Sequence, residues 1–108
     1  MRYFCAAALT ATLLTAGTAF GADKKGDAAK GKEVFEQCSV CHSATTDQKK
    51  MGPSLKGLYK KTKLANGQPV NDASVLSMVN KGKGSMPAFA DVLSSAEKTD
   101  LLAYLKTL

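Results

Sequence analysis

The sequence predicts a small all-α domain, and three observations support this fold class. Apolar side chains within residues 101–108 recur at the i, i+3, i+4 and i+7 positions of an amphipathic helix. Ser94, followed three residues later by Glu97, forms the pattern of a capping box directly before this helix. No segment of the chain makes a convincing strand.

Three main helices are expected in order. Asp27 is a good N-cap, and residues 28–37 are then typical of a helix. Asp72 is the expected N-cap of a second helix over residues 73–81, which carries an apolar stripe. Gly82 suits the position just past the end of that helix. The third helix is the one that follows the capping box.

The segments between the helices are predicted to be irregular. Residues 43–51 are polar and precede a Gly-Pro pair, after which residues 55–58 are expected to form a single helical turn. Residues 60–71 contain Asn-Gly and Gln-Pro dipeptides, which favour a loop. Residues 83–92 form a connection built around a Met-Pro pair.

The first residues have the features of a secretory signal peptide. Residues 1–2 supply a minimal positive start, residues 4–14 are apolar, and small residues follow. Ala19 and Gly21 satisfy the small-x-small rule for cleavage before Ala22, although cleavage after Ala19 or after Ala22 is also conceivable.

We therefore expect residues 1–21 to be removed on export to the periplasm and residues 22–108 to form one domain. A retained membrane anchor is the alternative, because residues 3–22 carry no charge. The four threonines and two glycines of that stretch make it a poor spanning helix. Cys5 lies within it and is assigned no role.

The chain is moderately basic, with 15 Lys and Arg against nine Asp and Glu and a formal net charge of +6. Removal of residues 1–21 takes away only Arg2, so the remaining domain has a formal charge of 14 − 9 = +5. A positive charge of this size suits an acidic protein partner. It gives little support for nucleic-acid binding, since no basic helix or base-stacking aromatic array accompanies it.

Cys38-Ser-Val-Cys41-His42 is the most informative motif of the chain. Two thiols three residues apart, followed directly by an imidazole, are typical of a c-type haem attachment site. Each thiol can add across a vinyl group of the porphyrin, and His42 can offer a neutral ring nitrogen to the iron. The sequence therefore predicts one covalently bound haem c per chain, held by Cys38 and Cys41 with His42 as an iron ligand.

Three other interpretations of this motif remain open at this point. A thioredoxin-like redox pair would need a strand–helix–strand setting that the sequence does not offer. A short-range disulfide would leave His42 without a role. A zinc site normally takes four Cys, His or carboxylate ligands, whereas this chain has one histidine and a single further cysteine near its start.

Taken in order, the motifs of residues 22–108 resemble those of a class I c-type cytochrome of the small bacterial monohaem kind. The resemblance implies the small cytochrome c fold, with about three main helices wrapped around one covalently attached haem. The matching residues are Gly31, Phe35, Cys38, Cys41, His42, Gly52, Pro53, Leu55, Gly84, Met86, Pro87, Leu101 and Tyr104.

The resemblance also implies a methionine as the second axial ligand, where a soft thioether raises the reduction potential. Met86 is the expected ligand because it lies in a loop and is followed by Pro87, which stiffens the backbone. Met51 lies on the His42 side in the family pattern. Met78 lies inside the second helix, where methionine usually fills gaps in a core. An iron with an open or different sixth ligand is the remaining alternative.

Two further residues have roles that the resemblance implies. The backbone carbonyl of Pro53 would accept the N–H of the non-ligating nitrogen of His42 and so fix the tautomer and ring plane. A plain loop proline is the alternative. Gly31, which as an interior helix glycine costs up to roughly 1 kcal/mol against alanine, is expected where the first and last helices cross closely.

Lysines gather in two clusters along the sequence. Solubility is the usual explanation for surface lysines, and the functional one is a positive rim around the haem edge that steers an acidic redox partner. The clusters are Lys49, Lys50, Lys56, Lys60, Lys61 and Lys63, and then Lys81 and Lys83.

These observations together predict a soluble one-electron carrier outside the cytoplasmic membrane that acts between redox proteins and has no small-molecule substrate. The chain offers no second histidine and no recognisable acid–base pair, so we do not expect an enzyme. One alternative is a haem c subunit of a larger dehydrogenase or oxidase complex. Another is a ligand-binding or peroxidase-like haem protein, which would need an open sixth position.

Overall fold

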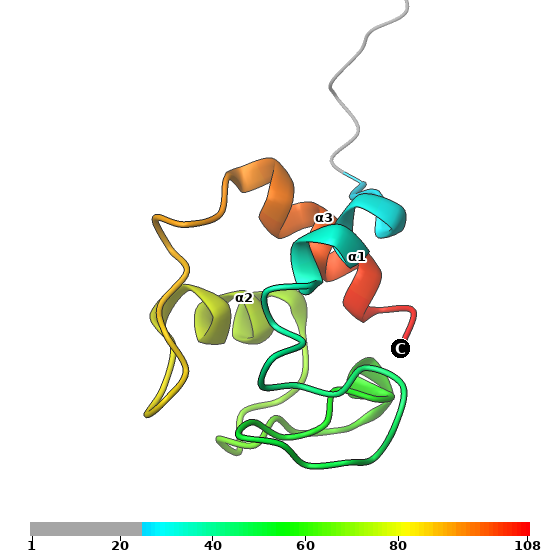
Figure 1. Ribbon diagram of the computed structural model, residues 1–108, viewed down its shortest axis with the longest axis vertical. Helices are drawn as coiled ribbons and strands as arrows, with labels where there is room; N and C mark the ends of the chain where they lie inside the picture. The colour runs from blue at the N-terminus through cyan, green and yellow to red at the C-terminus, as the bar shows by residue number, and fades with distance from the viewer. Residues whose placement is uncertain (1–24) are drawn as a thin grey trace, which may run out of the picture.

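The computed structural model describes residues 25–108, and the predicted signal peptide and Cys5 lie outside the described residues. The elements are α1 (Ala28–Phe35), the 3₁₀ helix η1 (Leu58–Lys60), α2 (Asp72–Lys81) and α3 (Ser95–Leu105). Within this part of the chain there is no strand, only two isolated bridges. The all-α prediction is therefore confirmed, and Figure 1 shows the three α-helices joined by long irregular segments.

Helix α1 begins where the sequence predicts and ends two residues earlier. The side chain of Asp27 accepts two backbone N–H bonds from the first turn, as expected of an N-cap. The helix stops at Phe35 because N–H groups beyond it bond three residues back, Glu36 to Glu33 at 3.2 Å and Cys38 to Phe35 at 2.7 Å, which is the spacing of a tighter turn. The predicted end at Gln37 is therefore wrong, and Cys38 lies in the turn that follows the helix.

Helices α1 and α3 cross at very close range, and Gly31 makes this possible (Figure 1). A Cβ atom on Gly31 would overlap the backbone carbonyl of Asp100 and would lie 2.8 Å from the Cβ of Tyr104. One turn further on, the rings of Phe35 and Tyr104 pack with their centroids 5.3 Å apart. The glycine inside the helix is thus explained by packing, as expected from the sequence.

Helix α2 is capped by Asn71, not by Asp72 as predicted. The side chain of Asn71 accepts the N–H of Ser74 at 2.8 Å, and the Ser74 hydroxyl accepts the N–H of Asn71 at 3.1 Å. Both residue types cap well, and the reciprocal pair with Ser74 decides between them. Gly82 ends the helix with a φ of 66°, a left-handed value that favours glycine.

The single helical turn predicted over residues 55–58 is found at 58–60 instead. The N–H of Leu55 is bonded to the carbonyl of Ser43 at 2.8 Å, so this residue belongs to a contact between two loops. Gly57 then takes a φ of 65° and starts η1. Helix α3 has the predicted capping box, with Ser94 and Glu97 bonded in both directions.

The hydrophobic core is small and lies between the helices. Leu101 of α3, only 2 % exposed, is its most buried side chain. Many further apolar residues pack against the core while part of their surface stays exposed. The buried members are Phe35, Leu58, Val75, Val79, Leu93, Leu101 and Leu105, and the half-buried ones include Leu55, Tyr59, Leu64, Val70, Phe89 and Tyr104.

Candidate haem-binding site

The residues of the Cys-x-x-Cys-His motif form one tight turn after α1. The N–H groups of Cys41 and His42 both donate to the carbonyl of Cys38, at 3.1 and 2.9 Å. Both thiols are free and partly buried. Burial first, and then the neighbouring Cys41, raises the pKa of the Cys38 thiol above its ordinary value. The turn therefore presents two free thiols from one short piece of backbone.

This geometry does not favour the other interpretations of the motif. The two thiols are not joined in a disulfide. Within residues 25–108 no group of three or more His, Cys, Asp or Glu side chains is placed to hold a metal ion, so a zinc site has no ligand set there. The described residues also contain no strand–helix–strand unit of the thioredoxin kind.

The imidazole of His42 is oriented by the Gly-Pro pair that follows the polar loop. Its Nδ1 lies 2.8 Å from the backbone carbonyl of Pro53, and because a carbonyl only accepts, Nδ1 carries the proton. Gly52 leaves room for the ring, since a Cβ there would lie 2.5 Å from Cε1 of His42. The N–H of Gly52 also donates to the carbonyl of Cys41 at 2.8 Å. Nε2 of His42 is thus left as the basic nitrogen, without a hydrogen-bond partner in residues 25–108.

Met86 is presented by a tight turn at the end of α2. Its N–H donates to the carbonyl of Lys83 at 3.0 Å, and the N–H of Lys83 donates back to the Met86 carbonyl at 3.1 Å. Gly84 inside the turn has a φ of 59°. A Cβ on Gly82 would overlap the Met86 carbonyl, so two glycines shape this loop. The loop is fastened to α2 by the N–H of Phe89, which donates to Val79 at 2.9 Å.

The three methionines of the described chain have different surroundings. Met51 is 76 % exposed and lies in the loop beside the Cys-x-x-Cys-His turn. Met78 is half-buried inside α2, where its carbonyl accepts the N–H of Gly82. Met86 is half-buried in an irregular segment. Met86 is therefore the one methionine of the three that is both half-buried and outside a helix.

Taken together, the residues present fit a covalently bound haem. Two free thiols and an imidazole oriented through Nδ1 come from five neighbouring positions of one turn. A macrocycle with a large apolar face would find partners in the half-buried side chains that pack against the small core. The chemistry of this donor set, sulfur and imidazole, is that of haem c attachment.

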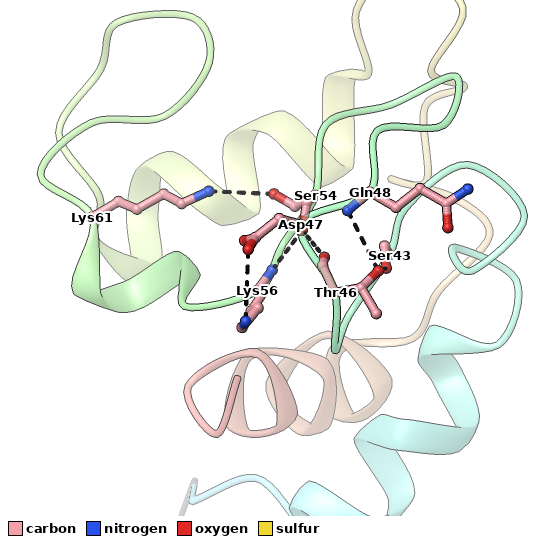
Figure 2. Close-up of polar contacts among 7 residues, drawn as sticks. All are labelled: Ser43, Thr46, Asp47, Gln48, Ser54, Lys56 and Lys61. Carbon is pink, nitrogen blue, oxygen red and sulfur yellow. Dashed lines mark hydrogen bonds and ion pairs between the residues drawn. The ribbon is translucent and has the colours of Figure 1, made fainter.

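Sequence reasoning missed a set of hydroxyl contacts around Ser54, the residue after Pro53, which Figure 2 shows. The Ser43 and Thr46 hydroxyls lie 2.6 Å apart, and Ser54 Oγ donates to the carbonyl of Thr46 at 2.5 Å. The N–H of Lys56 donates to Ser54 Oγ at 3.2 Å. These contacts join residues up to eight positions apart in irregular backbone, and no periodic signal in the sequence could have indicated them.

Comparisons with known proteins indicate one family. A family model described as "Cytochrome C oxidase, cbb3-type, subunit III" matches residues 26–105. Cytochrome c6 of Picosynechococcus sp. is 37 % identical over an alignment covering 97 % of this chain and 92 % of its own, and cytochrome c2 of Blastochloris viridis is 34 % identical, covering 74 % and 76 %. The crystal structure of cytochrome c6 from the diatom Phaeodactylum tricornutum superposes with a TM-score of 0.60 at 28 % identity, covering 76 % of this chain and 93 % of that one.

The chain therefore belongs to the cytochrome c family, as a small class I monohaem member. It carries haem c, covalently bound. More particularly, its relatives include cytochromes c6, c2 and c, so it is a cytochrome c electron carrier.

Proposed function

We propose that the protein carries single electrons between redox proteins outside the cytoplasmic membrane, with haem attached through Cys38 and Cys41 and with His42 and Met86 as its axial ligands. The observation that supports this best is the 2.8 Å contact between His42 Nδ1 and the Pro53 carbonyl, which leaves Nε2 free to bind iron. Pro53 is the residue that fixes the tautomer of this ligand.

The residues of the chain hold the group and set its properties. When bound, haem c supplies a reversible Fe²⁺/Fe³⁺ couple. Cys38 and Cys41 tether it, so that it cannot dissociate. His42 is oriented in advance by Pro53, and the thioether of Met86 stabilises ferrous iron relative to ferric. With His42 and Met86 both holding the iron, little would have to rearrange when an electron is transferred.

We assign no catalytic residue. His42, the only histidine of the sequence, is bonded to Pro53 and is proposed as an iron ligand. Electron transfer needs a haem edge close to a partner's cofactor and no substrate pocket. An open-iron, peroxidase-like function would need Met86 to stay away from the iron, and carbon monoxide binding to the reduced protein tests this.

The proposed partner is a redox protein with an acidic docking surface. Three of the loop lysines have contacts within the chain: Lys50 Nζ donates to the Ser39 carbonyl at 3.0 Å, Lys61 Nζ donates to the Ser54 carbonyl at 3.4 Å, and Lys56 pairs with Asp47 at 3.7 Å. The other loop lysines make no such contact with residues 25–108 and are the ones expected to steer a partner: Lys49, Lys60 and Lys63. Such steering acts mainly on the association rate and weakens with salt.

For location, we propose that residues 1–21 are removed during export and that residues 22–108 act in the periplasm. The apolar segment over residues 4–14 and the small residues before Ala22 support this. In residues 25–108 no helix is long and apolar enough to cross a membrane. The N-terminal residue of the mature protein, read by sequencing, tests the cleavage site.

The function is tested by absorption spectra of the oxidised and reduced protein together with its intact mass. We expect the intact mass to exceed that of the mature polypeptide without haem. The spectra should show a reversible one-electron change and the weak far-red band of an iron–sulfur bond. A mass equal to that of the bare polypeptide would end the proposal. Rapid binding of carbon monoxide by the reduced protein at neutral pH would contradict Met86 as a ligand and would indicate an iron with an open sixth position.

A second candidate is a haem c subunit of a larger complex. The description of the matching family model, an oxidase subunit, favours it. Val40 and Met51, which are 73 % and 76 % exposed, also place apolar surface at and beside the Cys-x-x-Cys-His turn. Native purification decides: a free carrier elutes at the mass of one small chain, and a subunit co-purifies with a large redox partner in fixed proportion.

A further inference from the structure

The Ser54 side chain lies next to the peptide group that orients His42. The carbonyl that accepts from His42 belongs to the peptide bond joining Pro53 to Ser54, and a peptide group is rigid and planar. Ser54 Oγ donates to the carbonyl of Thr46 at 2.5 Å and accepts the N–H of Lys56 at 3.2 Å (Figure 2). Whatever holds Ser54 in place therefore also holds the direction of the Pro53 carbonyl.

The acceptor of the Ser54 hydroxyl is itself held in place from the other side. The hydroxyls of Ser43 and Thr46 lie 2.6 Å apart, and Ser43 is 8 % exposed. The carbonyl of Ser43 accepts the N–H of Leu55 at 2.8 Å. Residues 43–46 and 53–56 are thus joined by a closed set of hydrogen bonds, and Ser43 follows His42 directly in the chain.

We propose that Ser54 is a positioning residue for His42 and thereby helps to set the reduction potential. This inference rests on the proposed function, in which His42 binds the iron. A firm hydrogen bond from Nδ1–H to Pro53 makes the imidazole a stronger donor, which favours ferric iron. Loss of the Ser54 hydroxyl lets the Pro53 carbonyl move, weakens that bond and shifts the balance toward ferrous iron.

A matched control separates this role from a general loss of stability. Ser74 Oγ donates to the carbonyl of Pro69 at 2.6 Å, and Ser74 is 9 % exposed. This is the same kind of hydroxyl-to-carbonyl contact, here with the carbonyl of another proline as acceptor, but it lies at the start of α2 and has no connection to Pro53. Ser74→Ala therefore removes a similar bond without touching the support of His42.

The experiment compares the haem-loaded wild type with Ser54→Ala, Ser54→Thr and Ser74→Ala. We expect Ser54→Ala to shift the ferric–ferrous equilibrium about three- to tenfold toward the ferrous form, or roughly 30 to 60 mV upward, since tenfold in a one-electron couple is 59 mV. We also expect faster exchange of the His42 Nδ1 proton, followed by NMR. Ser54→Thr, which keeps a hydroxyl, should have a reduction potential and a proton exchange rate close to those of the wild type. Ser74→Ala should leave the potential and the exchange rate unchanged.

The outcomes are distinct. An unchanged potential and proton exchange in Ser54→Ala, with normal haem spectra in the wild type, would overturn the inference and leave the proposed function standing. Equal shifts in Ser54→Ala and Ser74→Ala would overturn it as well. A wild type without haem would contradict the proposed function itself. If Ser54→Ala gives no folded holoprotein, Ser43→Ala replaces it, with a smaller shift of the same sign expected and no shift counting against the inference.

Discussion

At the scale of single residues, the surroundings of each methionine determine what its removal should change. Met51 is largely exposed, Met78 is held in α2, and Met86 lies in a turn bonded in both directions to Lys83. Only the last combines a half-buried side chain with a position in a well-defined turn outside the helices. The three side chains therefore form a natural series of variants.

Met86→Ala should lower the reduction potential and open the iron. Removal of the thioether would take away the proposed ligand that favours ferrous iron, and a fall on the order of 100 mV lies well within the ~0.8 V that axial ligands span. Redox titration and carbon monoxide binding measure the two effects. Met51→Ala is the matched control, because its exposed side chain should be replaceable with no change in potential; a Met86→Ala protein that behaves like this control would rule out the ligand.

The candidate residues for haem attachment stand out in the sequence, whereas the residues that contact them in the fold do not. Cys38, Cys41 and His42 are consecutive members of one motif, so their spacing alone indicates their chemistry. Ser54 and Gly52 act through contacts with residues 8 and 10 positions away in irregular backbone. Such contacts depend on how two loops fold against each other, which no local pattern describes.

At the scale of elements, the crossing of α1 and α3 depends on the missing side chain of Gly31. The Asp100 carbonyl that meets it is backbone, which cannot rotate away as a side chain could. The same crossing brings the N–H of Asp27 within 2.8 Å of Asp100 Oδ1. The two helices are thus joined at their contact and at the N-terminal end of α1.

Gly31→Ala should destabilise the protein by about 1–3 kcal/mol, the usual cost of inserting atoms into a well-packed contact. The intrinsic helix preference of alanine would act in the opposite direction and is smaller. Chemical denaturation of the holoprotein measures the free energy of unfolding. Lys32→Ala, on the exposed side of α1, is the control and should stay within about 0.5 kcal/mol of the wild type. A stabilised Gly31→Ala protein would mean that the crossing is looser than described.

A polar contact set joins η1, α2 and α3. Asp72 accepts from Lys106 Nζ at 2.9 Å and from the Tyr59 hydroxyl at 2.8 Å, and Lys106 Nζ lies 5.7 Å from the centre of the Tyr59 ring. The bond from Lys106, and then that from Tyr59, lowers the pKa of the Asp72 carboxyl below its ordinary value. Because the folded pKa lies below the unfolded one, ionised Asp72 stabilises the fold above about pH 3.9, and this contribution is lost as the pH falls through the folded pKa.

Asp72→Asn should therefore lower the melting temperature near neutral pH and make little difference in acid. These side chains are exposed enough that we expect a loss of at most about 1 kcal/mol at pH 7. Melting curves of the wild type and of Asp72→Asn are compared between pH 7 and pH 3. The difference between their melting temperatures should narrow below about pH 4. Asp91→Asn, an exposed carboxylate with no ion pair among residues 25–108, should show no gap at any pH. A gap that widens in acid would contradict the assignment.

The helices themselves were largely predictable, and their exact ends were less so. The capping box at Ser94 and the N-cap at Asp27 are local patterns, and both are found. The cap of α2 falls on Asn71 because of its mutual bonds with Ser74, a choice between two good capping residues that the sequence left undecided. The 3₁₀ turn is displaced because the N–H of Leu55 bonds to a distant loop.

At the scale of the whole molecule, the polypeptide buries few apolar side chains on its own. Within residues 25–108, seven hydrophobic residues are buried, and a larger number pack against them with part of their surface exposed. Chains of this size are marginal in stability even with a complete core. The covalently bound haem c is therefore expected to supply a large part of the core.

Removal of both attachment sites, Cys38→Ala with Cys41→Ala, should leave an apoprotein that is largely unfolded. Circular dichroism should show most of the helical signal lost, and proteases should cleave the chain readily. The Met86→Ala protein keeps its thioether links and should remain folded, so it serves as the control. A stable and well-packed apoprotein would contradict the view of haem as part of the core.

The hydrogen bond that joins Asp27 to α3 has a practical consequence. Asp27 is bonded to Asp100, and residues 25–27 lie at the opposite end of Figure 1 from the segment over residues 43–63, which carries six lysines. A tag joined ahead of residue 25 would therefore emerge far from that segment. Molecules immobilised on an electrode through such a tag should present the lysine-rich side outward, ready to meet a partner diffusing in from solution.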